Sequence, residues 1–243
     1  MNNIFYTFKW FYLLLILSML AGAACEKEDF TEPVSVDLKV GIAEGTHAHV
    51  SFNGGMVRFK QIWFDGQRNQ GGNVYFTTNK DRQIQSLNFS AKEAGYVKRF
   101  DIPQGVYSRM EWSFELDELD EDDNDMPDDF DGGLVITGSY RRPGGILIPI
   151  YFVVDEDERI AAISQGASES ENITLLANKS YEAQLILDPY YAFQPVTLAS
   201  LQATDIEEDD VDNPYIEISS DENKSLYESI IFRFEKSVKV IIK

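Results

Sequence analysis

Apolar and polar residues alternate with a period of two along most of this chain from Val34 onward, and this alternation limits the fold more than any other feature. The run Val34–Val40 alternates without a fault. The run Tyr107–Leu116 is longer, and its apolar residues share one face: Met110, Trp112, Phe114 and Leu116. Strands with one buried and one wet face, as in antiparallel sheets, have this period. The sequence therefore predicts a mainly β fold.

Further strand candidates are separated by Gly, Asn, Asp and Pro, which favour turns. They are His47–Phe52, Val57–Phe64, Asn73–Thr78, Gln83–Phe89, Tyr96–Ile102, Leu134–Tyr140, Ile146–Val154, Ile173–Leu176, Tyr181–Leu187 and Tyr215–Ser219. The turn Arg141–Gly145 is expected to close one hairpin, and Asn178-Lys179 another. Because Pro149 has no N–H, its strand should lie at a sheet edge or carry a bulge.

The C-terminal segment changes to a helical period. Leu226, Ile230, Ile231 and Phe234 fall on one helical face behind the capping residues Ser220–Asn223. We expect a helix over Asp221–Glu235 and a last strand over Val238–Ile242, with a strand over Ile230–Phe234 as the alternative. Residues 34–243 are thus predicted to form an antiparallel β-sandwich with one C-terminal helix.

The first 24 residues have the features of a cleaved leader. Lys9 precedes the apolar run Trp10–Leu20, and the small residues Ala21–Ala24 precede Cys25, the only cysteine. The run is too short to span a membrane, which takes about 20 apolar residues. This segment resembles a bacterial lipoprotein signal, although Gly22 stands where such signals usually have leucine. The resemblance implies cleavage before Cys25 and lipidation of its sulfur; an ordinary secretory signal is the alternative.

Residues 25–33 are polar and are expected to form a tether. Within them, Glu26, Lys27, Glu28 and Asp29 resemble the lysine-plus-acids signal that exports lipoproteins of Bacteroidota-type bacteria to the cell surface. The resemblance implies an outer-membrane protein, held by its lipid anchor and facing the cell exterior. Two or more acyl chains anchor a protein stably, since each buried methylene contributes about 0.8 kcal/mol.

The charge and the cysteine count exclude several classes of function. The chain carries 41 acidic and 21 basic residues, for a net charge of −20. Such a surface repels phosphate backbones, so a nucleic acid is not expected as a partner. With Cys25 lipidated, the mature chain has no thiol for disulfides, thiolate metal sites or nucleophilic catalysis.

The body also resembles a known group of proteins. The similarity rests on Pro103–Tyr107 before a strand, Gly138–Tyr140, Leu187–Pro189, and Asn223 followed by Leu226-Tyr227. These stretches resemble uncharacterised Bacteroidota surface lipoproteins with an immunoglobulin-like or transthyretin-like β-sandwich. The resemblance implies a fold and a location, and it brings no catalytic residues.

The segment 115–131 is a candidate calcium site, because it holds 11 acids and no base. Positions one, three, five, nine and twelve of an EF-hand-like loop correspond to Asp120, Asp122, Asn124, Asp128 and Asp131. The sixth position is Asp125 where such loops need glycine, and no flanking helix is expected. A solvated acidic loop is the alternative. No other cofactor is expected.

Catalytic side chains are few. His47 and His49 are the only histidines, and as a metal site they lack an assigned third ligand. The chain has no GxSxG motif. Among the aromatic residues, Trp112 and Trp63 are expected in the core. Tyr190 and Tyr191 follow Pro189 in a predicted loop and are the better candidates for stacking on sugar rings.

These features favour a non-catalytic binding or structural module on the outer membrane, with a glycan as the expected ligand. An adhesin or fimbria-like assembly subunit is the alternative, and a glycan-active hydrolase is a third reading. The expected partners are the membrane, through the lipid anchor, and a glycan or another surface protein.

Overall fold

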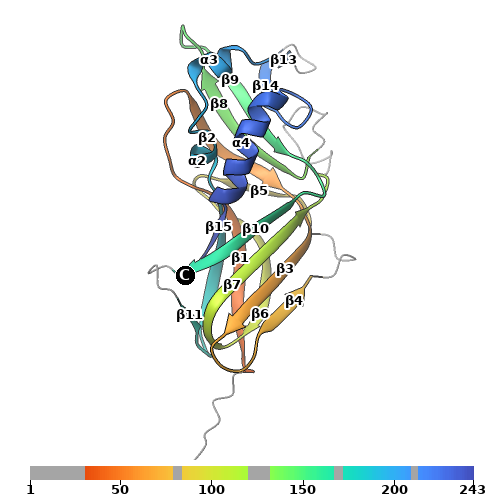
Figure 1. The fold of residues 1–243 in the computed structure, drawn as a ribbon, viewed down its shortest axis with the longest axis vertical. Helices are drawn as coiled ribbons and strands as arrows, with labels where there is room; N and C mark the ends of the chain where they lie inside the picture. Colours follow the sequence, from red (N-terminus) through yellow and green to blue (C-terminus); the bar gives the residue numbers. More distant parts are fainter. Residues whose placement is uncertain (1–30, 79–83, 120–131, 167–171, 209–212) are drawn as a thin grey trace, which may run out of the picture.

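The computed structural model describes residues 31–78, 84–119, 132–166, 172–208 and 213–243. The predicted signal peptide, Cys25 and the export signal Glu26–Asp29 lie outside these residues, as do all five predicted calcium ligands. The described residues form an elongated molecule of two β-rich lobes stacked along its long axis (Figure 1). No helix among them is long and apolar enough to cross a membrane.

The lower lobe is a curled sheet of nine strands. Its hydrogen-bonded order is β4 (Val74–Thr77), β3 (Phe59–Arg68), β7 (Gly105–Leu116), β10 (Arg159–Gly166), β15 (Lys239–Ile242), β12 (Ser180–Leu187), β1 (Pro33–Ile42) and β6 (Gly95–Pro103), with β11 (Ile173–Leu175) on β7. The curl brings the two end strands together, because Phe76 of β4 stacks on Phe100 of β6 with ring centroids 5.3 Å apart. The sheet is therefore nearly a barrel.

The upper lobe is a six-stranded sheet with helices on one face (Figure 1). Its order is β13 (Glu207–Glu208), β14 (Pro214–Ile218), β9 (Leu147–Val154), β8 (Leu134–Arg141), β2 (Val50–Val57) and β5 (Leu87–Ser90). The helices are α2 (Pro189–Ala192), α3 (Leu198–Gln202) and α4 (Lys224–Ser237). Phe152 of β9 packs edge-on against Phe193, which caps α2, and against Phe234 of α4. These contacts fix both helices on the sheet.

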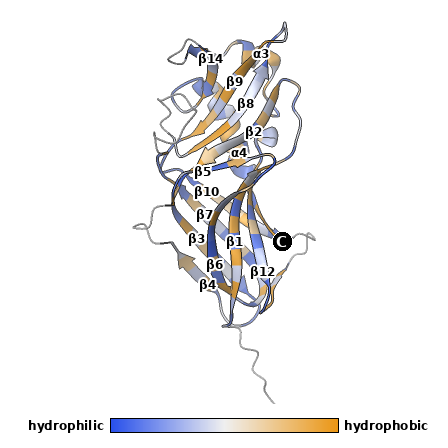
Figure 2. Ribbon diagram, turned by 180° about the vertical axis from the view of Figure 1, so that it is seen from behind, coloured by the Kyte–Doolittle hydropathy of each residue, from blue (hydrophilic) through white to orange (hydrophobic). Residues whose placement is uncertain are grey.

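A continuous apolar core joins the lobes, and Trp112 is its largest fully buried side chain. The ring of Trp112 contacts Phe64 and Phe100 edge-on, with centroids 4.7 and 5.5 Å away. Its indole N–H donates to the Ser164 hydroxyl at 2.9 Å. Along the strands, apolar and polar residues follow one another as the alternation predicts (Figure 2).

The structure confirms the mainly β fold and most predicted elements. The helix predicted over Asp221–Glu235 is α4, and the last strand is β15. The predicted hairpin across Arg141–Gly145 is formed by β8 and β9. Periodicity identified these elements because their buried faces are regular.

The prediction of an antiparallel sandwich was wrong about how the strands pair. Among the described strands, β1 with β12, β10 with β15, and β14 with β9 are parallel pairs, so both sheets are mixed. The hairpin predicted across Asn178-Lys179 does not form, since β11 pairs with β7 while β12 pairs with β1 and β15. Alternation shows which face is buried, but it does not identify the neighbouring strand.

The structure also differs from the sequence predictions at three local points. The strand β9 is internal, and Pro149 is tolerated because pairing with β14 begins one residue later, at Ile150. The strand β10 was missed, although its residues alternate between buried and exposed. The short helices α2 and α3 were missed, so the C-terminal helix is one of three described helices.

Candidate functional site

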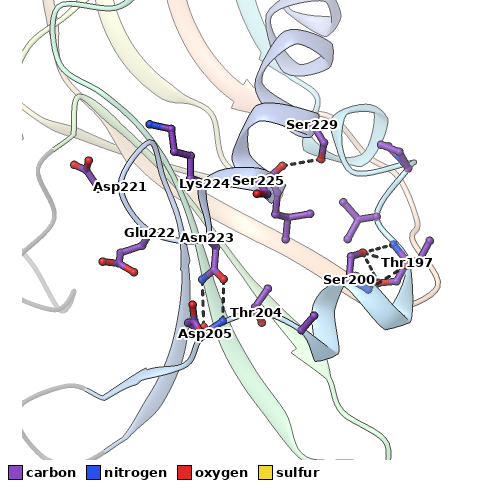
Figure 3. A pocket seen from close by; sticks show the side chains of 14 residues that line it. Thr197, Ser200, Thr204, Asp205, Asp221, Glu222, Asn223, Lys224, Ser225 and Ser229 are labelled. Atoms are coloured by element: carbon purple, nitrogen blue, oxygen red, sulfur yellow. Dashed lines mark hydrogen bonds between the residues drawn. The ribbon is translucent and has the colours of Figure 1, made fainter.

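A groove of about 670 Å³ lies in the upper lobe between α3 and the first turns of α4 (Figure 3). We call it the distal groove. Five hydroxyl side chains line it: Thr197, Ser200, Thr204, Ser225 and Ser229. Three carboxylates also line it: Asp205, Asp221 and Glu222. Its volume falls within the range of small-molecule sites, and polar and apolar atoms line it in about equal measure.

The α3 side of the groove is held by a capping box. Ser200 N–H donates to the Thr197 hydroxyl at 3.1 Å, and Thr197 N–H donates to the Ser200 hydroxyl at 2.8 Å. This reciprocal pair satisfies two backbone donors at the start of the helix. Two groove hydroxyls are thereby held in defined positions (Figure 3).

Asn223 fixes the α4 side. Its amide Nδ2 donates to the carbonyl oxygens of Glu217, at 2.7 Å, and of Asp205, at 3.2 Å. Its Oδ1 accepts from Asp205 N–H at 2.9 Å (Figure 3). The residue has φ of 50°, a left-handed conformation that Asn tolerates better than most residues. One side chain thus connects β14, the segment after α3, and the start of α4.

The electrostatic environment of the groove is acidic. Lys224 is the single basic side chain among its lining residues. Burial raises the pKa of the nearby Glu217 carboxyl; a hydrogen bond from Ser219 opposes this rise, while the charges of Glu222, Glu207 and Asp221 add to it. A neutral ligand fits this environment better than an anionic one.

Arg233 and Gln194 join α4 to the segment after α2. Arg233 follows Ser229 by four residues. It therefore lies on the same face of α4, about 6 Å further along the helix axis. Its Nη2 donates to Gln194 Oε1 at 2.8 Å, and its guanidinium lies 4.5 Å from the centre of the Tyr191 ring. The predicted ligand residue Tyr191 is 42% exposed. An aromatic ring therefore lies beyond the groove along α4.

Tyr190, the other predicted ligand residue, has extensive structural contacts. Its hydroxyl accepts from Phe52 N–H at 3.1 Å and lies 3.3 Å from Phe52 carbonyl oxygen, to which it donates. Its ring packs edge-on against the Phe52 ring, with centroids 5.3 Å apart. Tyr190 thus ties α2 to β2, and Tyr191 is the better placed of the two for a ligand.

The two histidines lie before β2, not within a strand as predicted. Nδ1 of His47 accepts from the backbone N–H groups of His49 and Val50, at 3.2 and 3.3 Å. Burial lowers the pKa of His47, and the neighbouring His49 adds to this effect. Among the residues that the structure describes, no three His, Cys, Asp or Glu side chains are grouped as metal ligands. The calcium prediction at residues 120–131 lies outside the described part.

The groove was not identified from the sequence, because its hydroxyls come from segments that meet only in the fold. The pair Thr197 and Ser200, three residues apart, was the one local signal of α3. The hydroxyls of Thr204 and Ser229 donate to the carbonyl oxygens of Leu201 and Leu226 and can still accept from a ligand.

No protein-family model, curated protein or solved structure matches this chain.

Proposed function

We propose that this chain is an outer-membrane surface lipoprotein, non-catalytic, that binds a neutral glycan in the distal groove. The supporting observation is the position of the groove relative to the predicted anchor. β1 begins at the lower end of the long axis, and α3 and the start of α4 lie at the upper end (Figure 1). A lipid on Cys25 would hold the lower end at the membrane and direct the groove outward.

The length of the tether agrees with this orientation. Seven residues lie between Cys25 and Pro33, and the eight steps from one to the other span at most about 28 Å when extended. The chain enters the body beside the turn between β6 and β7, where Gln104 N–H donates to Glu32 carbonyl oxygen at 2.8 Å. The lower lobe would therefore lie close to the membrane surface.

The groove's side chains suit a glycan. Hydroxyl and carboxylate oxygens supply acceptors for the hydroxyl groups of a sugar. The acids disfavour anionic ligands such as phosphates. Beyond the Arg233–Gln194 contact, the exposed Tyr191 ring can stack on a sugar of a longer chain.

A glycan array probed with the full chain tests this proposal. We expect neutral oligosaccharides to bind, Ser225→Arg to abolish binding by filling the groove, and Tyr191→Ala to weaken it for longer chains only. Tyr75→Ala is the matched control, because Tyr75 is 68% exposed on β4 in the other lobe. An array without hits, or binding that survives Ser225→Arg, would contradict the proposal.

A fimbria-like assembly subunit is the second candidate, favoured by the seam of the near-barrel. The hydrogen-bonded order of the described strands ends at β4 and β6. Val74 and Phe76 of β4 and Val97 of β6 are only partly buried there, packed at the margin of the core. A free strand edge beside apolar side chains can accept a strand from another chain. Sedimentation of the detergent-extracted chain as a polymer would support this role, and a monomer would exclude it.

A further inference from the structure

Two elements of opposite charge lie at the same, upper end of the six-stranded sheet, with β14 and β9 between β13 and β8. One is the turn between β8 and β9, where Arg141 and Arg142 are exposed. The other is β13, which consists of Glu207 and Glu208. We call them the basic turn and the acidic strand.

The basic turn has a defined shape. Arg142 N–H donates to Ile146 carbonyl oxygen at 2.8 Å, and Gly145 N–H donates to Arg142 carbonyl oxygen at 3.0 Å. Gly144 and Gly145 have φ of 101° and 91°, which side-chain-bearing residues rarely adopt. The turn presents Ile146 and Leu147 to solvent, with 64% and 54% of their surface exposed. Large aliphatic side chains exposed together indicate a contact surface.

The acidic strand lies at the same end of the sheet. β14 runs parallel to β9 with Ile216 opposite Ile150, so β14 begins beside the basic turn. Glu208 of β13 pairs with Pro214 at the start of β14. Since neighbouring strands are about 4.8 Å apart, β13 is about 10 Å to the side of β9. Ile206, directly before the acidic strand, is 36% exposed.

Among the residues that the structure describes, the charges of these two elements have no ion-pair partner. No ion pair with a described residue is formed by the two arginines of the basic turn or by the two glutamates of the acidic strand. The chain as a whole carries a charge of −20, so copies of it repel one another over most of their surface. The basic turn is a local exception to this repulsion.

From this arrangement we infer that the upper end is a contact surface for a second copy of the chain. Adjacent patches of opposite charge are self-complementary under a two-fold axis, which sets the basic turn of each copy against the acidic strand of the other. Ile146 and Leu147 would then pack near the partner's Ile206, with the arginines against the partner's glutamates. None of these residues lines the distal groove, so self-association and glycan binding are separate properties.

Sedimentation velocity of the detergent-solubilised full chain, over a range of concentrations, tests this inference through charge reversal. We expect a concentration-dependent dimer that weakens with added salt. Arg141→Glu with Arg142→Glu should raise the dimer dissociation constant at least about tenfold, because acids then face acids. Glu207→Arg with Glu208→Arg should do the same. Combining all four changes in one chain should restore the dimer, since every charge pair is then reversed.

Two controls separate this contact from other effects. All four positions lie at the surface or half-buried, so the thermal melting midpoint of each variant should match the original chain. A chain that stays monomeric up to about 1 mM, the weak end of specific association, would overturn the inference. So would a failure of the fourfold variant to restore the dimer. Binding of the monomer to phosphatidylglycerol vesicles through Arg141 and Arg142 would instead assign the basic turn to an anionic lipid surface.

Discussion

Single side chains decide how the lower lobe packs around its core, and Trp112 is the clearest case. Its core position was predicted from alternation along Tyr107–Leu116, and the structure confirms it, with the residue fully buried. Its polar partner could not be predicted, because Ser164 lies on β10, a strand that the sequence analysis missed. The alternation of Arg159–Gly166 is carried by small and polar residues such as Ala162 and Ser164, which give a weak hydrophobic signal.

Replacing Ser164 with alanine should leave the buried Trp112 indole N–H without its partner. An unsatisfied buried donor costs about 1–3 kcal/mol, so urea denaturation should show a loss of stability of this size. Ser113→Ala is the matched control on the wet face of β7, and it should change stability by less than about 0.5 kcal/mol. Equal effects of the two changes would show that the hydrogen bond from the Trp112 indole to Ser164 contributes nothing to stability.

The raised pKa of Glu217 predicts a pH dependence of stability. A carboxyl whose pKa is higher in the folded state binds protons more readily there. The free energy of unfolding therefore falls as the pH rises from the ordinary pKa of 4.5 through the raised pKa. Glu217→Gln should therefore raise the melting midpoint at pH 7. The gain should stay below about 1 kcal/mol, because water screens a half-exposed carboxylate. Below pH 4, where the carboxyl is neutral in both states, the two proteins should melt together, and a gain that persists there would point to another cause.

At the scale of elements, the sequence was informative about strands and about α4, and uninformative about how the groove is assembled. The apolar spacing of Leu226, Ile230 and Phe234 predicts the helix, and Ile230 and Phe234 are fully buried. The role of Asn223 was predicted as part of a cap, yet its side chain makes no cap bond to α4. It binds Asp205 and Glu217 instead, and these partners depend on tertiary structure.

Two substitutions at Asn223 separate its hydrogen bonds from its backbone conformation. Asn223→Gly keeps the left-handed conformation and loses three side-chain bonds, at a cost of about 2 kcal/mol for these partly exposed groups. Asn223→Ala should lose the same hydrogen bonds and roughly 1 kcal/mol of stability more, because alanine is strained in the left-handed conformation. Denaturant titration of both variants measures the difference. If alanine were no worse than glycine, the backbone conformation of this residue would not be under strain.

At the scale of the whole molecule, composition and alternation predicted the fold class but not the arrangement of the sheets. The parallel pairs β1 with β12 and β10 with β15 join segments far apart in sequence, and no local pattern encodes such partners. These pairs assemble the nine-stranded sheet of the lower lobe, and the upper lobe stacks on it along the long axis (Figure 1). That arrangement separates the start of β1 from the distal groove, and the proposed orientation at the membrane depends on it (Figure 1).

The anchor at Cys25 is the claim on which location and orientation both rest. Mass spectrometry of the N-terminal peptide, from chain recovered in the membrane fraction, tests it most directly. We predict a chain that begins at Cys25 and carries the added mass of two or three acyl chains, enough for stable anchoring. A Cys25 with a free thiol, or a chain that still carries residues 1–24, would contradict the account.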